Sequence, residues 1–222
     1  MKLQIALDAI TLEKAVELVQ EARDYVDILE IGTPMVIEYG MLAVRTMREN
    51  FPEKEILADL KIMDGGKYEA NQAFNAGADY ITVLGVTDNL TIKGCVEAAN
   101  ECGKEIVVDM ICVDDLAGRV KELEALGAHG VAVHVGVDQQ ASGRTPLDDL
   151  KVMKAAASTA KVSLNEEKEA RSIPISLTIF LNFNVKSLGF LGRSPKYLDG
   201  NNQLDLLAFL NKCNSASISL GK

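Results

Sequence analysis

The stretch LQIALDAITLEKAVELVQEARDYVDILEI, residues 3–31, holds a short apolar run, an amphipathic segment and a second apolar run. The runs 3–7 and 28–31 are too short for helices and almost wholly apolar, which predicts strands buried on both faces. Between them, the segment 12–22 carries apolar residues at the spacing of one helical face. The stretch therefore predicts one strand–helix–strand unit.

Similar units recur about every 25 residues along the first 135 positions. The further apolar runs are 56–60, 80–84, 106–110 and 131–135, and glycines at Gly77 and Gly127 suit the left-handed residue that ends a helix. Strands that alternate with helices favour a parallel sheet with right-handed crossovers.

The chain length decides between two parallel-sheet folds. A doubly wound open sheet usually has a glycine-rich first turn, which residues 8–11 (DAIT) lack, whereas 222 residues suit a compact barrel. We predict an α/β fold of the (β/α)8 TIM-barrel type.

Composition excludes several classes of protein. The chain is 48% hydrophobic and 25% charged, as globular proteins are, and its net charge of −9 disfavours nucleic-acid binding. No apolar run is long enough to span a membrane, and the N-terminus turns polar too soon for a signal peptide. The four cysteines lack metal or disulfide spacing, which predicts free thiols and a cytoplasmic protein.

Polar residues interrupt or follow the predicted strands where a barrel carries its chemistry. They are Asp8, Glu30, Asp59, Lys61, Asp64, Asp109 and His134. Several carboxylates at one rim need positive charge nearby, because burying them unpaired is costly. Lys61 supplies one charge, and a divalent cation is the natural second.

The most suitable metal ligands are Glu30 and Asp59, which come from adjacent strand ends and carry the hard oxygens that Mg²⁺ prefers. His134 is either a satisfied core histidine or a proton-transfer group beside the acidic rim. His129 precedes its strand, at the opposite end of the barrel, and we assign it no chemistry.

The motifs resemble a known family. The run DLKIMD at 59–64 is similar to the DxKxxD motif of the orotidine 5'-monophosphate decarboxylase superfamily. Together with four further stretches it resembles the 3-hexulose-6-phosphate synthases up to about residue 162. The stretches are LQIALD at 3–8, EIGTP at 30–34, HVGVDQQ at 134–140 and GRTPL at 143–147.

The resemblance implies an aldehyde-lyase of formaldehyde assimilation, a homodimer in which formaldehyde condenses with D-ribulose 5-phosphate through a Mg²⁺-dependent enediolate. It implies that Glu30 and Asp59 bind the metal and that Lys61 stabilises the enediolate. Asp8 and Asp109 would contact substrate hydroxyls, with Asp109 alternatively in a proton relay. His134 would move the C1 proton, and Asp64 would reach the neighbouring subunit's site.

The related 3-keto-L-gulonate 6-phosphate decarboxylases are the alternative within the superfamily. They carry an arginine three residues after the histidine of the sixth strand, where this chain has Val137. They also tend to have glutamate at the position of Asp109. Both differences favour the synthase.

The charge balance and the motif pattern of the sequence change after Val162. This change suggests barrel units in residues 1–162 and a divergent segment in 163–222. The net charge is −12 over residues 1–160 and +3 over 161–222. The glycines that the family carries in strands 7 and 8, which grip the substrate phosphate, are missing. We expect these two strands to be atypical or absent, and we hypothesise a change of reading frame near this point.

This loss leaves open a function of another class. A chain that keeps the first six units and lacks the phosphate site would be a non-catalytic protein derived from a barrel. The intact acidic rim favours the enzyme, and the missing glycines favour this alternative.

Overall fold

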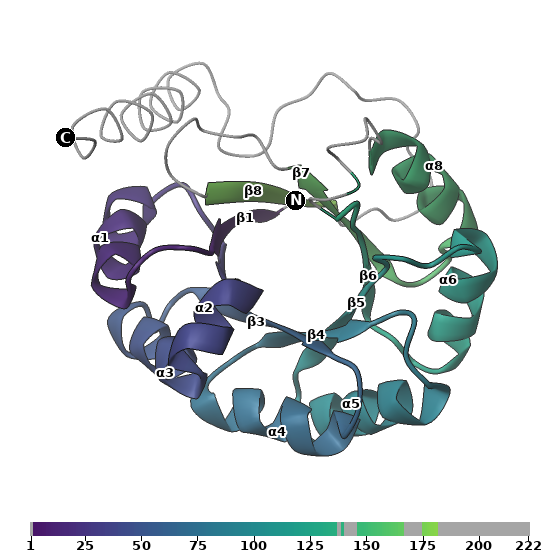
Figure 1. Ribbon diagram of the computed structural model, residues 1–222, viewed down its shortest axis with the longest axis horizontal. Helices are drawn as coiled ribbons and strands as arrows, with labels where there is room; N and C mark the ends of the chain where they lie inside the picture. The colour runs from purple at the N-terminus through teal and green to yellow at the C-terminus, as the bar shows by residue number, and fades with distance from the viewer. Residues whose placement is uncertain (1, 137–138, 140–145, 167–174, 182–222) are drawn as a thin grey trace.

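The computed structural model describes residues 2–136, 139, 146–166 and 175–181. Eight strands form a closed barrel in the order β1 to β8, surrounded by helices (Figure 1). The predicted barrel is confirmed.

The strands are β1 (Lys2–Leu7), β2 (Ile28–Ile31), β3 (Glu55–Ile62), β4 (Tyr80–Leu84), β5 (Glu105–Asp109), β6 (Gly130–Val133), β7 (Lys161–Glu166) and β8 (Ile175–Leu181). The helices are α1 (Leu12–Ala22), α2 (Thr33–Tyr39), α3 (Met41–Asn50), α4 (Gly66–Ala76), α5 (Asn89–Cys102), α6 (Leu116–Ala125) and α8 (Pro146–Ala156). Each apolar run predicted as a strand in the first 135 residues forms one.

Helix α1 shows how the sequence sets the boundaries of an element. The Thr11 hydroxyl accepts the N–H of Lys14 at 3.3 Å and caps the first turn. The buried face is the predicted apolar stripe, which includes Ala15, Leu18 and Val19. At the other end of a helix, Gly77 closes α4 with φ of +111°, a conformation that a residue with a Cβ adopts at a cost.

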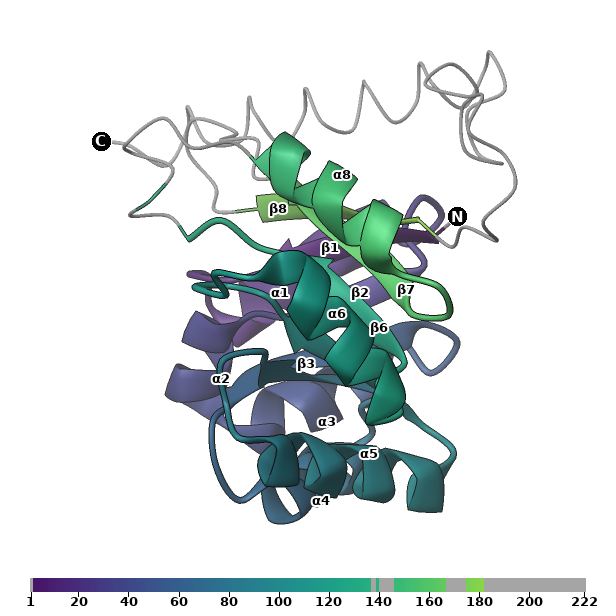
Figure 2. The same cartoon turned by 90° about the vertical axis from the view of Figure 1, so that its right-hand side faces the viewer.

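The core has two parts. The larger part lies between the strands and the surrounding helices and is built from aliphatic side chains of both. A smaller cluster fills the inside of the barrel and consists of Ile28, Leu57, Tyr80, Val107 and Ala132. Figure 2 shows α6 and α8 side by side over the strands on one flank. The small inner cluster forms an apolar floor below the polar side chains described in the next section.

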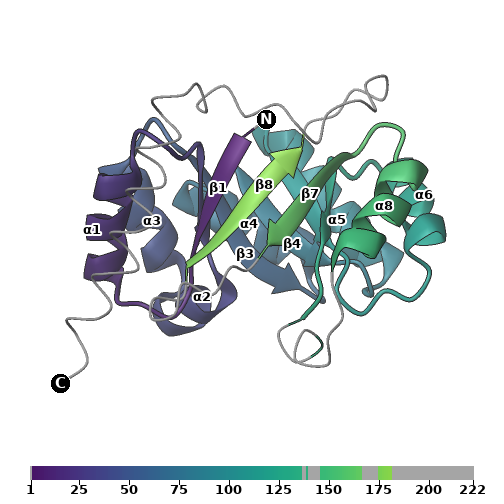
Figure 3. The same cartoon turned by 90° about the horizontal axis from the view of Figure 1, so that it is seen from above.

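The closing strand departs from the usual barrel. Strands β1 to β7 run parallel to one another, whereas β8 is antiparallel to both of its neighbours, β7 and β1. Figure 3 shows β8 between β1 and β7, with its arrow opposed to that of β7. The register pairs Leu7 with Ile175 and Val162 with Leu181, so β8 begins where β7 ends. The prediction that strands 7 and 8 are atypical or absent is confirmed for β8, whereas β7 is present and pairs with β6 in the regular parallel manner.

Several sequence-based predictions fall outside the described residues. These concern Val137 and the neighbouring positions 138, 140 and 143–145 of the two motif stretches, and the segments 167–174 and 182–222. Within the described part of the chain, no helix is long and apolar enough to cross a membrane. There, Cys95, Cys102 and Cys112 are free thiols, in agreement with the prediction.

Candidate active site

The carboxyl end of β3 holds a carboxylate and a lysine in direct contact. Asp59 is 6% exposed, and its Oδ2 lies 2.5 Å from Lys61 Nζ. The same ammonium lies 3.4 Å from Asp109 Oδ2 at the end of β5. Burial works against the charge of Lys61, but the carboxylates of Asp59 and Asp109 raise its pKa above the ordinary value. Lys61 is therefore held as a cation between two acids.

Glu30, at the end of β2, is the most strongly perturbed of these acids. It is 7% exposed, and one carboxylate oxygen accepts a hydrogen bond from Gln4 Nε2 on the neighbouring strand β1. Burial, and then the negative charges of Asp59 and Asp8, raise its pKa well above the ordinary value. The charge of Lys61 and the hydrogen bond from Gln4 only partly offset these effects, so the ionised form of Glu30 is not fully compensated.

Asp109 and His134 form a pair between β5 and the end of β6. Asp109 Oδ2 lies 2.8 Å from His134 Nδ1, and Asp109 Oδ1 accepts the N–H of Ile111 at 2.9 Å. Burial alone would raise the pKa of Asp109, yet the contact with His134 and the charge of Lys61 hold it below the ordinary value. An ionised Asp109 places the proton of a neutral His134 on Nδ1 and the lone pair on Nε2.

The remaining predicted residues lie in different surroundings. Asp8 follows β1 and packs so closely on Gly32 that a Cβ there would lie 1.9 Å from its Oδ1. Asp64 is exposed, and its Oδ1 accepts the N–H of Gly65 at 2.7 Å. The structure therefore gathers Asp8, Glu30, Asp59 and Asp109, here called the acidic mouth, around Lys61, while Asp64 points to the surface.

Four polar residues of this end escaped the sequence analysis: Gln4, Thr33, Thr82 and Ser163. Thr33 Oγ1 donates to Asp59 Oδ2 at 2.7 Å, and Thr82 Oγ1 donates to Asp59 Oδ1 at 2.7 Å. Gln4 Oε1 and Ser163 Oγ are buried, and neither finds a hydrogen-bond partner among the residues that the structure describes. For Gln4 and Thr82 the available signal was a polar residue among apolar strand residues, which does not by itself tell which face the side chain occupies. Thr33 begins helix α2, and Ser163 lies among other polar residues of β7, so neither carried such a signal.

A small cavity connects these side chains inside the barrel. Its volume is about 10 Å³, which is close to the space that one water molecule occupies. It is lined by the acids Glu30, Asp59 and Asp109, by Gln4, Thr82 and Ser163, and by apolar residues of the barrel floor. Side chains from separate strands therefore converge on one point.

The oxygens of the acidic mouth suit a divalent cation that takes few of its ligands from the protein. Among the residues that the structure describes, no three His, Cys, Asp or Glu side chains are grouped to hold a metal ion by themselves. Mg²⁺ typically uses one or two carboxylates and completes its shell with water and substrate oxygens. Glu30 and Asp59 are both buried and have the oxygen chemistry for that role, and the raised pKa of Glu30 shows that its charged form would gain from a further cation.

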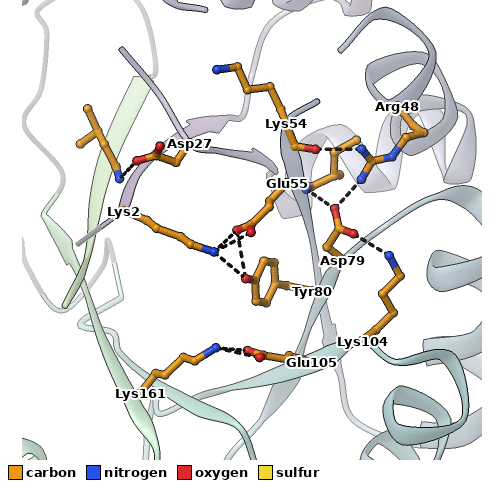
Figure 4. A network of polar contacts seen from close by, with 12 residues as sticks. Lys2, Asp27, Arg48, Lys54, Glu55, Asp79, Tyr80, Lys104, Glu105 and Lys161 are labelled. Carbon is orange, nitrogen blue, oxygen red and sulfur yellow. Dashed lines mark hydrogen bonds and ion pairs between the residues drawn. The ribbon is translucent and has the colours of Figure 1, made fainter. Parts of the chain in front are cut away.

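The opposite end of the barrel holds a network of ion pairs, here called the amino-end network (Figure 4). It contains Lys2, Asp27, Arg48, Lys54, Glu55, Asp79, Tyr80, Lys104, Glu105 and Lys161. His129 also lies at this end, where its Nδ1 accepts the N–H of Ile106 at 3.3 Å and burial lowers its pKa. The seven predicted site residues all lie at or beyond the other ends of the strands.

With this geometry in place, comparison with known families gives the class of protein. Residues 1–173 match the orotidine 5'-phosphate decarboxylase / HUMPS family. This match covers well over half of the chain, which therefore belongs to that family. The resemblance drawn from the motifs is confirmed, and the family match ends before the last part of the chain.

Individual relatives narrow the comparison further. The 3-hexulose-6-phosphate synthase of Bacillus subtilis is 49% identical over 164 residues, which cover 74% of this chain and 78% of that protein. The crystal structure of 3-hexulose-6-phosphate synthase from Salmonella typhimurium is 52% identical with a TM-score of 0.74, over 77% of this chain and 81% of that one. The structure of 3-keto-L-gulonate-6-phosphate decarboxylase from Vibrio cholerae is 33% identical with a TM-score of 0.66, over 73% and 77%.

Proposed function

We propose that this chain is a 3-hexulose-6-phosphate synthase, which condenses formaldehyde with D-ribulose 5-phosphate to give D-arabino-hex-3-ulose 6-phosphate. The observation that carries the proposal is the convergence of Lys61, His134 and the acidic mouth in a chain about 50% identical to two synthases. The lower identity to the decarboxylase of Vibrio cholerae favours the synthase over that alternative.

The proposed reaction begins with removal of a proton from C1 of ribulose 5-phosphate, next to the ketone. Nε2 of His134 takes this proton, since Asp109 holds Nδ1 at 2.8 Å and stabilises the imidazolium that results. The electron pair of the C–H bond moves into an enediolate. Lys61, whose pKa is raised, stays charged and stabilises the negative oxygen.

The second step forms the new carbon–carbon bond. C1 of the enediolate attacks the carbon of formaldehyde, the carbonyl of the product forms again at C2 of the former ribulose, and the formaldehyde oxygen takes the proton from His134. Glu30 and Asp59 would hold Mg²⁺, which when bound supplies further positive charge for the enediolate. Asp8 would bind a substrate hydroxyl.

A direct assay tests this proposal. The purified full chain is mixed with ribulose 5-phosphate, formaldehyde and Mg²⁺, and the loss of formaldehyde is followed. We expect loss that stops when EDTA is added. In His134→Ala, exchange of the C1 proton with solvent should cease while Mg²⁺ binding persists, and exchange at the wild-type rate would remove His134 from the mechanism.

We further propose that the enzyme acts as a homodimer in the cytoplasm. Large apolar side chains are exposed on adjacent units, among them Ile37 at 80%, Tyr68 at 73% and Leu90 at 76%. Asp64 lies in the same part of the chain and would serve the neighbouring site. Mixing Asp64→Ala with His134→Ala subunits should restore part of the activity that each variant lacks, and a wholly inactive mixture would contradict this arrangement.

A second candidate function follows from the reversed strand. Because β8 is antiparallel, its carboxyl end pairs with the start of β7 and so lies away from the acidic mouth, where a regular barrel would use it to bind phosphate. This observation favours a non-catalytic protein derived from a barrel. Absence of formaldehyde loss at every Mg²⁺ concentration, with no binding of ribulose 5-phosphate by calorimetry, would support it.

A further inference from the structure

The hydroxyl of Thr82 joins two functional groups of β3 from the neighbouring strand. Thr82 is 5% exposed, on β4, inside the barrel. Its Oγ1 accepts the backbone N–H of Lys61 at 2.9 Å and donates to Asp59 Oδ1 at 2.7 Å. A hydroxyl carries one proton and two lone pairs, so it makes both hydrogen bonds at once.

Lys61 needs this support because its backbone conformation is unusual. Its φ is +48°, in the left-handed region that disfavours residues with a Cβ. The pairing of β3 with β4 shifts register between Ala58 and Ile62, so Lys61 lies outside the regular ladder. Its N–H therefore bonds to a side chain. Irregularities of this kind commonly redirect a side chain next to an active site.

The redirected lysine and the oriented carboxylate meet at the acidic mouth. Lys61 Nζ lies 2.5 Å from Asp59 Oδ2, and Thr33 holds that same oxygen from the other side at 2.7 Å. With Thr82 on Oδ1, both oxygens of Asp59 are fixed. A rotation of the carboxylate or of the Lys61 backbone would separate the two groups.

We propose that Thr82 is a positioning residue, whose single hydroxyl holds Lys61 in its left-handed conformation and fixes the plane of the Asp59 carboxylate. The importance of this contact for catalysis rests on the proposed function. The conformational part of the inference does not depend on it.

Two substitutions separate the hydroxyl from the shape of the side chain. Thr82→Val keeps the size and branching and removes the hydroxyl, whereas Thr82→Ser keeps the hydroxyl. A matched control is Thr87→Val, because Thr87 is also buried and its hydroxyl donates to the carbonyl of Met63 at 2.5 Å. Neither Asp59 nor Lys61 contacts that hydroxyl in the described contacts.

Crystal structures of the full-length variants give the first test. In Thr82→Val, φ of Lys61 should become negative and its Nζ should leave Asp59, while Thr82→Ser and Thr87→Val should keep φ near the observed value. A Lys61 that stays left-handed in Thr82→Val, with Asp59 unmoved, would overturn the inference.

Metal binding gives the second test, with Mn²⁺ as a probe and electron paramagnetic resonance as the readout. Groups that orient a ligand typically change metal affinity by 10–100-fold, which we expect for Thr82→Val, with about threefold or less for Thr82→Ser. Equal Mn²⁺ affinity in wild type and Thr82→Val would contradict the inference. If the wild type binds no Mn²⁺ and consumes no formaldehyde, the proposed function fails, and the conformation of Lys61 still decides the role of Thr82.

Discussion

The two ends of the barrel distribute charge in opposite ways. In the amino-end network, carboxylates are matched by cations: Lys2 lies 2.5 Å from Glu55, Lys161 lies 2.5 Å from Glu105, and Asp79 bonds to both Arg48 and Lys104. In the acidic mouth, by contrast, burial and the negative charges of Asp59 and Asp8 raise the pKa of Glu30.

This difference indicates that the charged groups of the amino-end network stabilise the fold, whereas those of the acidic mouth serve the proposed chemistry. Partly exposed ion pairs such as Lys2–Glu55 contribute little each, but within each pair the two charges offset each other. Within the acidic mouth, the raised pKa of Glu30 shows that its charged form is unfavourable in the folded chain, and such costs are typical of functional sites. Substitutions at the two ends should therefore differ in sign as well as in size.

The largest effect should come from removing the cation of the acidic mouth. Lys61→Met should lower kcat/KM for formaldehyde condensation by about 10²–10³-fold, since the enediolate loses a charged donor. Lys2→Met removes a lysine of the amino-end network and should leave kcat/KM within about twofold of the wild type. The measurement is steady-state loss of formaldehyde, and similar effects of the two substitutions would refute the contrast.

Neutralising one acid at each end should change stability in opposite directions. Glu30→Gln should raise the free energy of unfolding by about 0.5–2 kcal/mol in metal-free buffer at pH 7, because it removes an uncompensated buried charge. Glu55→Gln should lower it by about 1 kcal/mol or less. Urea denaturation measures both, and a loss of stability in Glu30→Gln would show that this carboxylate is already compensated.

The dependence of stability on pH should also differ between the ends. The pKa of Glu30 is raised in the folded chain, so its contribution is fully present below the ordinary value of 4.5 and is lost as pH rises through the folded pKa. The pKa of Asp79 is lowered, because the lysine, arginine and backbone contacts outweigh burial. Its contribution is present above 3.8 and is lost as pH falls.

Unfolding in urea at a series of pH values checks these signs. As pH rises above 4.5, Glu30→Gln should remove a decline in stability that the metal-free wild type shows. Asp79→Asn should instead change the acid limb below pH 4. Identical slopes for wild type and Glu30→Gln would mean that Glu30 titrates normally.

The smallest effect on stability should come from removing one ion pair of the amino-end network, and this effect should depend on salt. Lys161→Met should lower the free energy of unfolding by about 0–1 kcal/mol, since Lys161 and Glu105 are each about one-third exposed. The difference between wild type and variant should shrink in 1 M NaCl, where ionic screening is strong. A difference independent of salt would assign the effect to packing of the lysine stem.

The sequence predicted the fold well up to β6 because each unit there carries its own signal. The apolar run at 28–31 and the helical stripe at 12–22 form elements at those bounds. The convergence of Glu30, Asp59 and Asp109 was also predictable, since polar residues that follow parallel strands meet at one end.

Other features could not be predicted because they depend on partners far away in the sequence. A threonine within a strand, such as Thr82, is compatible with either face until the register is known. The left-handed conformation of Lys61 accompanies a register shift between β3 and β4, and no local sequence pattern predicts such a shift. Likewise, an apolar segment such as that of β8 carries no information about the direction in which the strand runs.

The antiparallel closing strand indicates how a barrel can stay closed when the sequence of its last unit changes. Seven parallel strands leave two unpaired edges, which invite association with other chains. Backbone donors and acceptors on such edges can be met by a strand of either polarity, as β8 shows with β1 and β7. If a change of reading frame replaced the original repeat, as hypothesised from the sequence, an extended segment of unrelated sequence would still pair with both edges and close the sheet.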